Sequence, residues 1–262
     1  MIRGTSDAVI TVHQFPCLAD NYGFLVHDDA SGETACVDTP EPAVILAEAA
    51  ARAWPITQIW NTHWHPDHAG GNAAVRAATG ARITCPDEVA RGGDGGERVV
   101  GDGDVIALGA HPVRVLGVGG HTRGHVAFVL DDPPLAFVGD ALFALGCGRM
   151  FEGTAEQFWA SLTRLAALPD ATLVHCAHEY TQANARFALA VDGDNPALRA
   201  RAADVDARRA AGLPTVPSRI DLERATNPFL RAPRLAAAIG LADAPAHAAF
   251  AELRRRKDAF RP

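Results

Sequence analysis

The chain has 262 residues, a net charge of −7 and 48% hydrophobic side chains. This length allows one large domain, or a core domain with a smaller attachment, and a core that needs no disulfide. The acidic balance argues against nucleic acid or an anionic membrane as the main partner. No apolar run reaches the ~18 residues of a membrane span, so none is expected. The first ten residues lack the pattern of a signal peptide.

The five cysteines are scattered, odd in number and without a Cys-x-x-Cys pair: Cys17, Cys36, Cys85, Cys147 and Cys176. This pattern is not that of a disulfide framework or a structural zinc site. It predicts a reduced, cytoplasmic, globular protein. We expect a monomer, because no segment stands out as an interface.

Strand and helix patterns alternate over the first two-thirds of the chain. Short apolar or alternating runs bounded by Gly, Asp, Asn and Pro predict strands at Val9–Val12, Gly23–Val26, Ala35–Val37, Ile56–Trp60, Arg82–Cys85, Val113–Val118, Ala127–Leu130, Leu135–Val138 and Thr172–Cys176. Helical composition marks Ala43–Ala53, Gly71–Ala78 and Ala155–Leu168, the last with Thr154 as its N-cap. The mixture predicts stacked sheets with outer helices, a mixed α/β (α+β) class.

The composition changes after about residue 180. Thr181–Val191, Pro196–Ala211 and Ala246–Lys257 are rich in Ala and Arg and have helical character. The stretch from Gly212 to Pro228, rich in Pro and Asn, is expected to be a loop. The C-terminal part is therefore predicted to be a small helical domain.

A cluster of metal-ligating residue types follows the predicted strand Ile56–Trp60. Three imidazoles and one carboxylate lie within six residues, at His63, His65, Asp67 and His68. Imidazole nitrogen and carboxylate oxygen suit zinc, iron or manganese. The first two histidines can converge on one ion, while the aspartate and the third histidine can face a second.

Three further candidates each follow a later predicted strand: His121, Asp140 and His178. Alone, each residue would more often be a hydrogen-bonded structural side chain than a ligand. Together they favour a metal site, because strand ends at one edge of a sheet can meet. His125 lies close to His121 in sequence and is interpreted as a residue that supports the ligands or as a structural one.

These motifs resemble the metallo-β-lactamase superfamily, and within it the glyoxalase II family, over nearly the whole chain. Besides the histidine cluster, the resemblance rests on Asp20-Asn21-Tyr22, Val37-Asp38, Gly120-His121-Thr122, Gly124-His125, residues 139–143, 146–149, 151–154, 178–181, 214–218, 227–231 and 253–258. It implies an αββα metallo-β-lactamase sandwich over residues 1–178 as the catalytic domain. Residues 179–262 would then form a small helical substrate-binding domain.

The resemblance also implies a ligand set for two divalent metal ions. One ion would take His63, His65 and His121, and the other would take Asp67, His68 and His178. Asp140 would bridge the two ions. Asp67 and Asp140, the two carboxylates of this ligand set, are the expected catalytic residues. Zinc is the expected metal, and iron and manganese are compatible with the same ligands.

The activity implied is hydrolysis of S-D-lactoylglutathione and related 2-hydroxyacylglutathiones to glutathione and D-lactate, a step in methylglyoxal detoxification. A hydroxide held between the two metals would attack the thioester carbonyl. A thiolate leaves readily because thiols have a pKa of about 8.5. The site therefore suits a thioester better than an amide.

By resemblance, the glutathione pocket would be lined by Arg149, Phe151, Tyr180, Arg254 and Lys257. The family often has Lys at the position of Arg149 and commonly has Tyr at that of Phe151. Arg254 and Lys257 lie three residues apart, so in a helix they share a face. Read without the resemblance, they would be a solvated basic helix end.

The main alternative is a glutathione persulfide dioxygenase with a single iron on the same fold. Such an enzyme would use His63, His65, His121 and Asp140 without a complete second site. The presence of Asp67, His68 and His178 together, with a helical C-terminal region, favours the hydrolase. A secreted β-lactamase, a non-catalytic metal-binding module and an RNA-processing nuclease fit the sequence less well.

Overall fold

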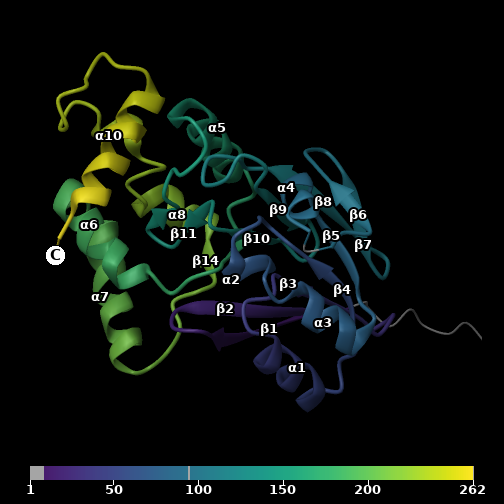
Figure 1. The fold of residues 1–262 in the computed structure, drawn as a ribbon. Coiled ribbons are helices and arrows are strands. Elements are labelled where there is room, and N and C mark those ends of the chain that lie inside the picture. Colours follow the sequence, from purple (N-terminus) through teal and green to yellow (C-terminus); the bar gives the residue numbers. More distant parts are fainter. Residues whose placement is uncertain (1–8, 94, 262) are drawn as a thin grey trace, which may run out of the picture. The chain divides into compact units, whose positions relative to one another are not determined.

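The chain divides into two compact units in the computed structural model, which describes residues 9–93 and 95–261. Figure 1 shows the helices and strands along the chain. The first unit runs to Gly117 and includes Phe128–Pro133; the second comprises Val118–Ala127 and the chain from Pro134 onward. Residues 1–8, which bear on the expected lack of a signal peptide, lie outside the described residues. Within the described residues, no helix is both long and apolar enough to span a membrane.

The first unit is built on a six-stranded sheet whose strands follow chain order: β1 (Ile10–Cys17), β2 (Asn21–Asp28), β3 (Glu33–Val37), β4 (Ile56–Trp60), β5 (Arg82–Pro86) and β6 (Arg98–Val100). The first three strands pair antiparallel, whereas β3 to β6 pair parallel. Parallel neighbours need crossover connections. These are provided by α1 (Pro42–Ala51), α3 (Asn72–Thr79) and α4 (Asp87–Arg91).

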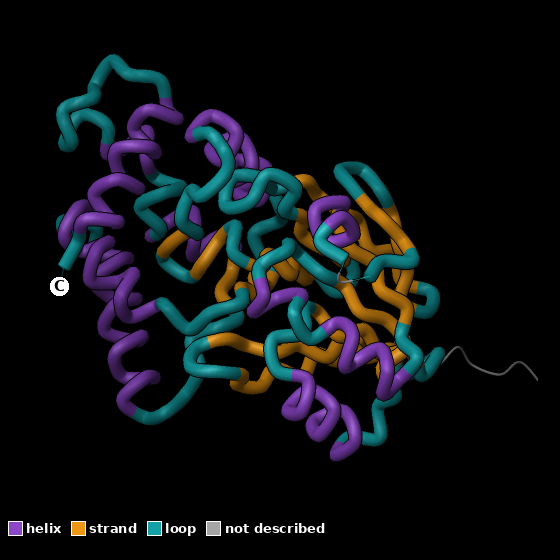
Figure 2. Tube along the Cα trace, in the orientation of Figure 1, coloured by secondary structure: helices purple, strands orange, loops and turns teal. Residues whose placement is uncertain are grey.

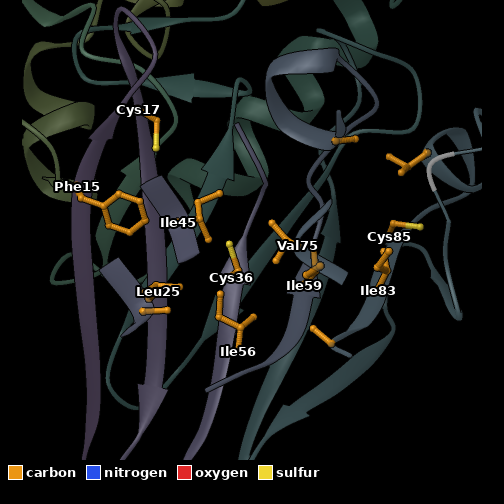
Figure 3. Close-up of a cluster of buried hydrophobic side chains, with 14 residues drawn as sticks. Phe15, Cys17, Leu25, Cys36, Ile45, Ile56, Ile59, Val75, Ile83 and Cys85 are labelled. Atoms are coloured by element: carbon orange, nitrogen blue, oxygen red, sulfur yellow. The ribbon is translucent and has the colours of Figure 1, made fainter. Parts of the chain in front are cut away.

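The core of this unit forms where the sheet meets those helices (Figure 3). Leu25 and Ile59 from the strands are fully buried with Ile45 of α1 and Val75 of α3. The β7–β8 hairpin (Val105–Leu108 and His111–Gly117) also belongs to this unit. It is linked to the six-stranded sheet by Gln58, whose side-chain amide donates to the Ala107 carbonyl at 3.0 Å. Strand β9 (Val126–Leu130) then carries the chain between the two units.

The second unit contains a parallel strand pair, β10 (Leu135–Gly139) and β13 (Leu173–Cys176), connected through α5 (Ala155–Ala166). The two-residue strand β14 (Ser218–Arg219) pairs antiparallel with β13. A short hairpin, β11 (Leu142–Phe143) with β12 (Gly146–Cys147), follows β10 directly. The predicted ligand Asp140 therefore lies in the short turn between β10 and β11.

Five helices complete the second unit and form its helical C-terminal region (Figure 2): α6 (Thr181–Asp192), α7 (Pro196–Ala210), α8 (Ile220–Thr226), α9 (Ala232–Leu235) and α10 (Ala246–Ala259). Helices α6 and α7 pack on each other around Ala188 and Leu198, which are fully buried. Helix α10 packs against α5 through the ring contact of Phe250 with Phe158.

All nine expected strands and six expected helices are present, and their ends differ from the predictions by a few residues. Thr154 caps α5, since its hydroxyl accepts from the Gln157 amide at 3.1 Å. The expected loop from Gly212 to Pro228 is partly wrong, because it contains β14 and α8. Helix α8 has little signal in its own composition and forms because Ile220 and Glu223 are buried against the rest of the unit.

The boundary expected between residues 178 and 179 stays a prediction. The two units are defined by contacts within the chain, and residues 134–178 cluster with the C-terminal helices. The expected domains, in contrast, separate a catalytic part from a substrate-binding part.

Glu223 is the fully buried acid that ties α8 to its surroundings. Its carboxylate accepts from Arg201, from the Ser218 hydroxyl, from the Asn227 side-chain amide at 2.9 Å and from the Leu145 backbone amide at 3.0 Å. A buried carboxylate is tolerated only with such compensation. The network therefore ties α7 and α8 to the β11–β12 hairpin.

We predict that Glu223→Ala lowers the free energy of unfolding by about 3–5 kcal/mol, because the Arg201 guanidinium, whose side chain is only 11% exposed, loses its charged partner. Urea unfolding followed by circular dichroism measures the change. The control is Asp87→Ala, which breaks an exposed i, i+4 pair with Arg91 and should shift the midpoint little. Equal shifts for the two variants would contradict a stabilising role for this network.

Candidate metal centre

The first group of predicted ligands lies where the parallel strands β3 and β4 end. The Asp38 amide donates to the Trp60 carbonyl at 2.9 Å, so the residues that follow the two strands run side by side. Parallel strands point their carboxyl ends to the same edge, where α/β proteins commonly place ligand sites. This edge brings His63, His65, Asp67 and His68 together.

Asp38 orients two of these histidines. Its carboxylate accepts from the Thr62 amide, the Thr62 hydroxyl and His68 Nδ1, each at 2.8 Å. Because that hydroxyl donates to Asp38, it accepts from His63 Nδ1 at 3.0 Å. Both imidazoles therefore carry their proton on Nδ1, so Nε2 is the nitrogen that can bind a metal. Asp38 belongs to one of the motifs that carry the resemblance, but the sequence alone does not predict this role.

The donor atoms of this half fall into two pairs. His63 Nε2 lies 3.0 Å from His65 Nδ1, and His68 Nε2 lies 3.5 Å from an Asp67 carboxylate oxygen. Two ligands on one tetrahedral zinc are roughly 3.3 Å apart when each bond is about 2.0–2.1 Å. Asn21 holds the Asp67 carboxylate by a 3.1 Å hydrogen bond. The spacing of both pairs thus fits ligands that share an ion.

The second group of ligands follows the parallel strands β10 and β13. The Ala177 amide donates to the Gly139 carbonyl at 3.2 Å, which sets Asp140 beside His178. One Asp140 carboxylate oxygen lies 3.4 Å from His121 Nε2, and the other lies 3.4 Å from His178 Nε2. Each oxygen can therefore share an ion with a different imidazole.

His121 is held in the tautomer that a metal ligand needs. Its Nδ1 donates to the Arg149 carbonyl at 2.8 Å, which leaves Nε2 toward Asp140. The preceding Gly120 has a φ of +149°, and a Cβ there would lie 2.2 Å from the Phe158 ring. Only glycine fits this position, which closes the turn that presents His121.

His125 lies beside the ligands with its nitrogens on backbone groups. Its Nε2 accepts from the Asp140 amide at 3.1 Å, and its Nδ1 lies 3.1 Å from the Val126 carbonyl. It thus holds the backbone of Asp140, in keeping with its interpretation as structural.

Two of the expected substrate contacts are aromatic rings beside ligands. Phe151 is 60% exposed, and its ring centre lies 5.3 Å from that of His121. The Tyr180 ring stacks on that of His178, with the ring centres 4.7 Å apart and the rings nearly parallel. Arg149, also exposed, lies two residues before Phe151 in the chain. These three side chains are accessible to a bound molecule.

The other two expected contacts lie on α10 and differ in exposure. Arg254 is only 5% exposed and donates to the Cys147 carbonyl at 2.9 Å and to Asp258 at 2.8 Å. Lys257 is half-buried, and its ammonium donates to the Ala183 carbonyl at 2.8 Å. Burial, with a smaller effect from Arg254, lowers the pKa of Lys257 from 10.5 to about 8.

Two known family models match successive parts of the chain. A model described as "Metallo-beta-lactamase superfamily" matches residues 29–178, more than half of the chain. A second, "Hydroxyacylglutathione hydrolase C-terminus", matches residues 179–260. The expected metallo-β-lactamase fold, followed by a helical C-terminal region, is thereby confirmed.

Relatives with a name and solved structures also match large parts of the chain. Hydroxyacylglutathione hydrolase of Erythrobacter litoralis is 55% identical, over 96% of this chain and 100% of the relative. Among crystal structures, ETHE1 from Myxococcus xanthus is 25% identical, with a TM-score of 0.69 over 96% of this chain and 93% of its own. TTHA1623, crystallised in a di-iron-bound form, is 26% identical with a TM-score of 0.54, over 64% and 91% of the two chains. The chain belongs to the hydroxyacylglutathione hydrolase family, also called glyoxalase II.

We predict that Asp38→Asn weakens metal binding by roughly 10- to 100-fold, the usual effect of removing a carboxylate that orients a histidine ligand. The amide cannot accept all three hydrogen bonds that the carboxylate accepts. Competition with a chromogenic chelator measures the affinity. The exposed Asp29 supplies the control variant Asp29→Asn, which should bind metal like the wild type. Unchanged affinity in Asp38→Asn would contradict the orienting role.

Proposed function

We propose that the two groups of ligands together hold two divalent metal ions. His63, His65 and His121 would hold one ion, Asp67, His68 and His178 would hold the second, and Asp140 would contribute an oxygen to each. The observation that carries this proposal is the position of Asp140, whose two oxygens each lie 3.4 Å from a different imidazole. A carboxylate in that position suits a bridge between two ions better than a ligand to one.

The chemistry of the donor atoms fits two divalent metal ions. The first unit presents the donor pairs His63–His65 and Asp67–His68, and the second presents Asp140 with His121 and with His178. Neutral imidazole nitrogens and carboxylate oxygens suit zinc, iron and manganese, and we propose zinc as the resident metal. The di-iron form of the relative TTHA1623 shows that a protein of this fold can hold two ions.

We propose that the protein is a hydroxyacylglutathione hydrolase that cleaves S-D-lactoylglutathione and related 2-hydroxyacylglutathiones to glutathione and D-lactate. The proposal is supported by the 55% identity with a relative of that name, of which this chain covers the full length. When bound, the two metal ions would supply a hydroxide nucleophile at neutral pH and polarise the thioester carbonyl.

The chain's own residues prepare the site before substrate binds. Asp38 and the Arg149 carbonyl fix histidine tautomers, so no ligand must reorient during turnover. Asp67 and Asp140 are the proposed catalytic carboxylates within the ligand set. The glutathione thiolate leaves without a dedicated proton donor, since a thiol has a pKa near 8.5.

We propose that Arg149, Phe151, Tyr180, Arg254 and Lys257 contact the glutathione moiety. Glutathione carries two carboxylates, which guanidinium and ammonium groups bind by charge-assisted hydrogen bonds. Arg254 Nε is buried, and among the described residues it has no hydrogen-bond partner, so this group can still donate. The proposed substrate-binding part is the helical region 179–262.

We further propose that the enzyme works as a monomer in the cytoplasm. The proposed location is supported by the five cysteines, which are buried and free of disulfides. Burial raises the pKa of Cys17 and Cys176 to about 12, which keeps these thiols protonated.

The direct test is hydrolysis of S-D-lactoylglutathione by purified protein, with metal content measured on the same sample. We expect turnover with close to two metals per chain, lost on chelation, and sedimentation near the monomer mass of 27.6 kDa. Asp140→Asn should lose bound metal and at least 100-fold in kcat while remaining folded. Asp131→Asn changes an exposed acid paired with Arg114 and should retain full activity.

Two results would contradict the proposed function. Full turnover by Asp140→Asn would remove this residue from the site. One iron per chain, no thioester hydrolysis and oxygen uptake on glutathione persulfide would move the function to the dioxygenase.

The lowered pKa of Lys257 predicts a pH dependence of substrate binding. The ammonium loses its charge as pH rises through about 8, so KM for the thioester should rise between pH 7 and pH 9. Lys257→Arg keeps a charge throughout and should abolish this rise. Lys257→Met should raise KM at pH 7 by roughly 10-fold, the loss of one charge-assisted hydrogen bond. Steady-state kinetics across pH test this, and identical profiles for wild type and Lys257→Arg would contradict it.

A further inference from the structure

The β11–β12 hairpin is held by side chains from the C-terminal region. Asn184 of α6 donates to the Ala144 carbonyl at 3.1 Å, and Asn227, after α8, donates to the Gly146 carbonyl at 2.9 Å. Glu223 of α8 accepts from the Leu145 amide at 3.0 Å. These bonds satisfy buried backbone groups that the two-residue strands leave unpaired.

Arg254 of α10 holds the end of the same segment. One terminal nitrogen of its guanidinium donates to the Cys147 carbonyl at 2.9 Å and lies 3.5 Å from the Gly148 carbonyl. The other terminal nitrogen pairs with Asp258, and the guanidinium carbon lies 5.1 Å from the Phe229 ring centre. A 5% exposed cation fixed on both sides is a rigid anchor.

The anchored segment is in direct contact with two proposed metal ligands. A Cβ at Gly148 would lie 2.1 Å from the Asp140 carbonyl and 2.9 Å from His121 Nδ1, so this backbone is packed against both residues. The next carbonyl, that of Arg149, accepts the Nδ1 proton of His121 at 2.8 Å. A small displacement of the segment would therefore move the group that fixes the His121 tautomer.

We propose that Arg254 is a positioning residue for His121, acting through the Cys147–Arg149 backbone. This inference rests on the metal centre proposed above. It gives α10 a role in metal binding besides any contact with glutathione. A residue that only binds the substrate carboxylate would affect KM and leave metal affinity unchanged, so the two roles can be separated.

The test uses the full-length protein with Arg254→Met and Arg254→Lys. The control is Arg255→Met on the same helix, where the exposed Arg255 pairs only with Glu252 among the described residues. The first readout is the His121 Nδ1 proton in metal-free protein, observed by nitrogen-15 NMR and assigned by its loss in His121→Asn. The second readout is zinc affinity, measured by competition with a chelator.

We expect Arg254→Met to lose the protected His121 signal and to bind zinc at least 10-fold more weakly. Arg254→Lys keeps a donor of different reach and should give an intermediate affinity, while Arg255→Met should match the wild type. Should Arg254→Met fail to fold by circular dichroism, Arg254→Lys carries the same comparison. An intact His121 signal with wild-type zinc affinity in the folded variant would overturn the proposal.

The two readouts also separate this inference from the proposed function. Wild-type protein that binds no metal would overturn the proposed metal centre, and the inference with it. Wild-type protein with two metals, together with Arg254 variants changed only in KM, would overturn the positioning role and leave the proposed function standing.

Discussion

The parallel pairing of strands is the constraint on which each half of the candidate centre depends. In the first unit, β3 and β4 end together, and Asp38 and the histidine cluster follow them. In the second unit, β10 and β13 end together, and Asp140 and His178 follow them. Because hydrogen-bonded parallel strands share a direction, residues far apart in sequence reach one edge without long loops. The chemistry of both halves rests on this repeated geometry.

The ligands are presented by buried polar groups whose hydrogen bonds leave them little freedom. Asp38 makes three hydrogen bonds and determines the proton positions of His63 and His68. His121 takes its tautomer from a backbone carbonyl. Buried polar groups without partners are costly, so such networks are either complete or destabilising. Here the hydrogen bonds at Nδ1 orient the imidazoles of His63, His68 and His121 in advance of a metal.

The C-terminal helices support the second half of the centre. Glu223 and Asn227 hold the β11–β12 hairpin, and Arg254 holds the segment that follows it. The family model for the C-terminus covers this region, from residue 179 to residue 260. A helical region expected only to bind substrate thus also fixes backbone that touches His121 and Asp140.

The sequence by itself determined the regular elements, through hydrophobic periodicity and capping residues, and the family, through the His-x-His-x-Asp-His cluster and the later single ligands. It did not reveal α8, which lies in an expected loop and forms through burial, or the part that Asp38 plays. Nor could it show that Arg254 is buried and donates to a backbone carbonyl of its own chain. Backbone acceptors such as the Arg149 carbonyl exist at every residue and carry no sequence signal, so only the tertiary structure decides which of them orients a ligand.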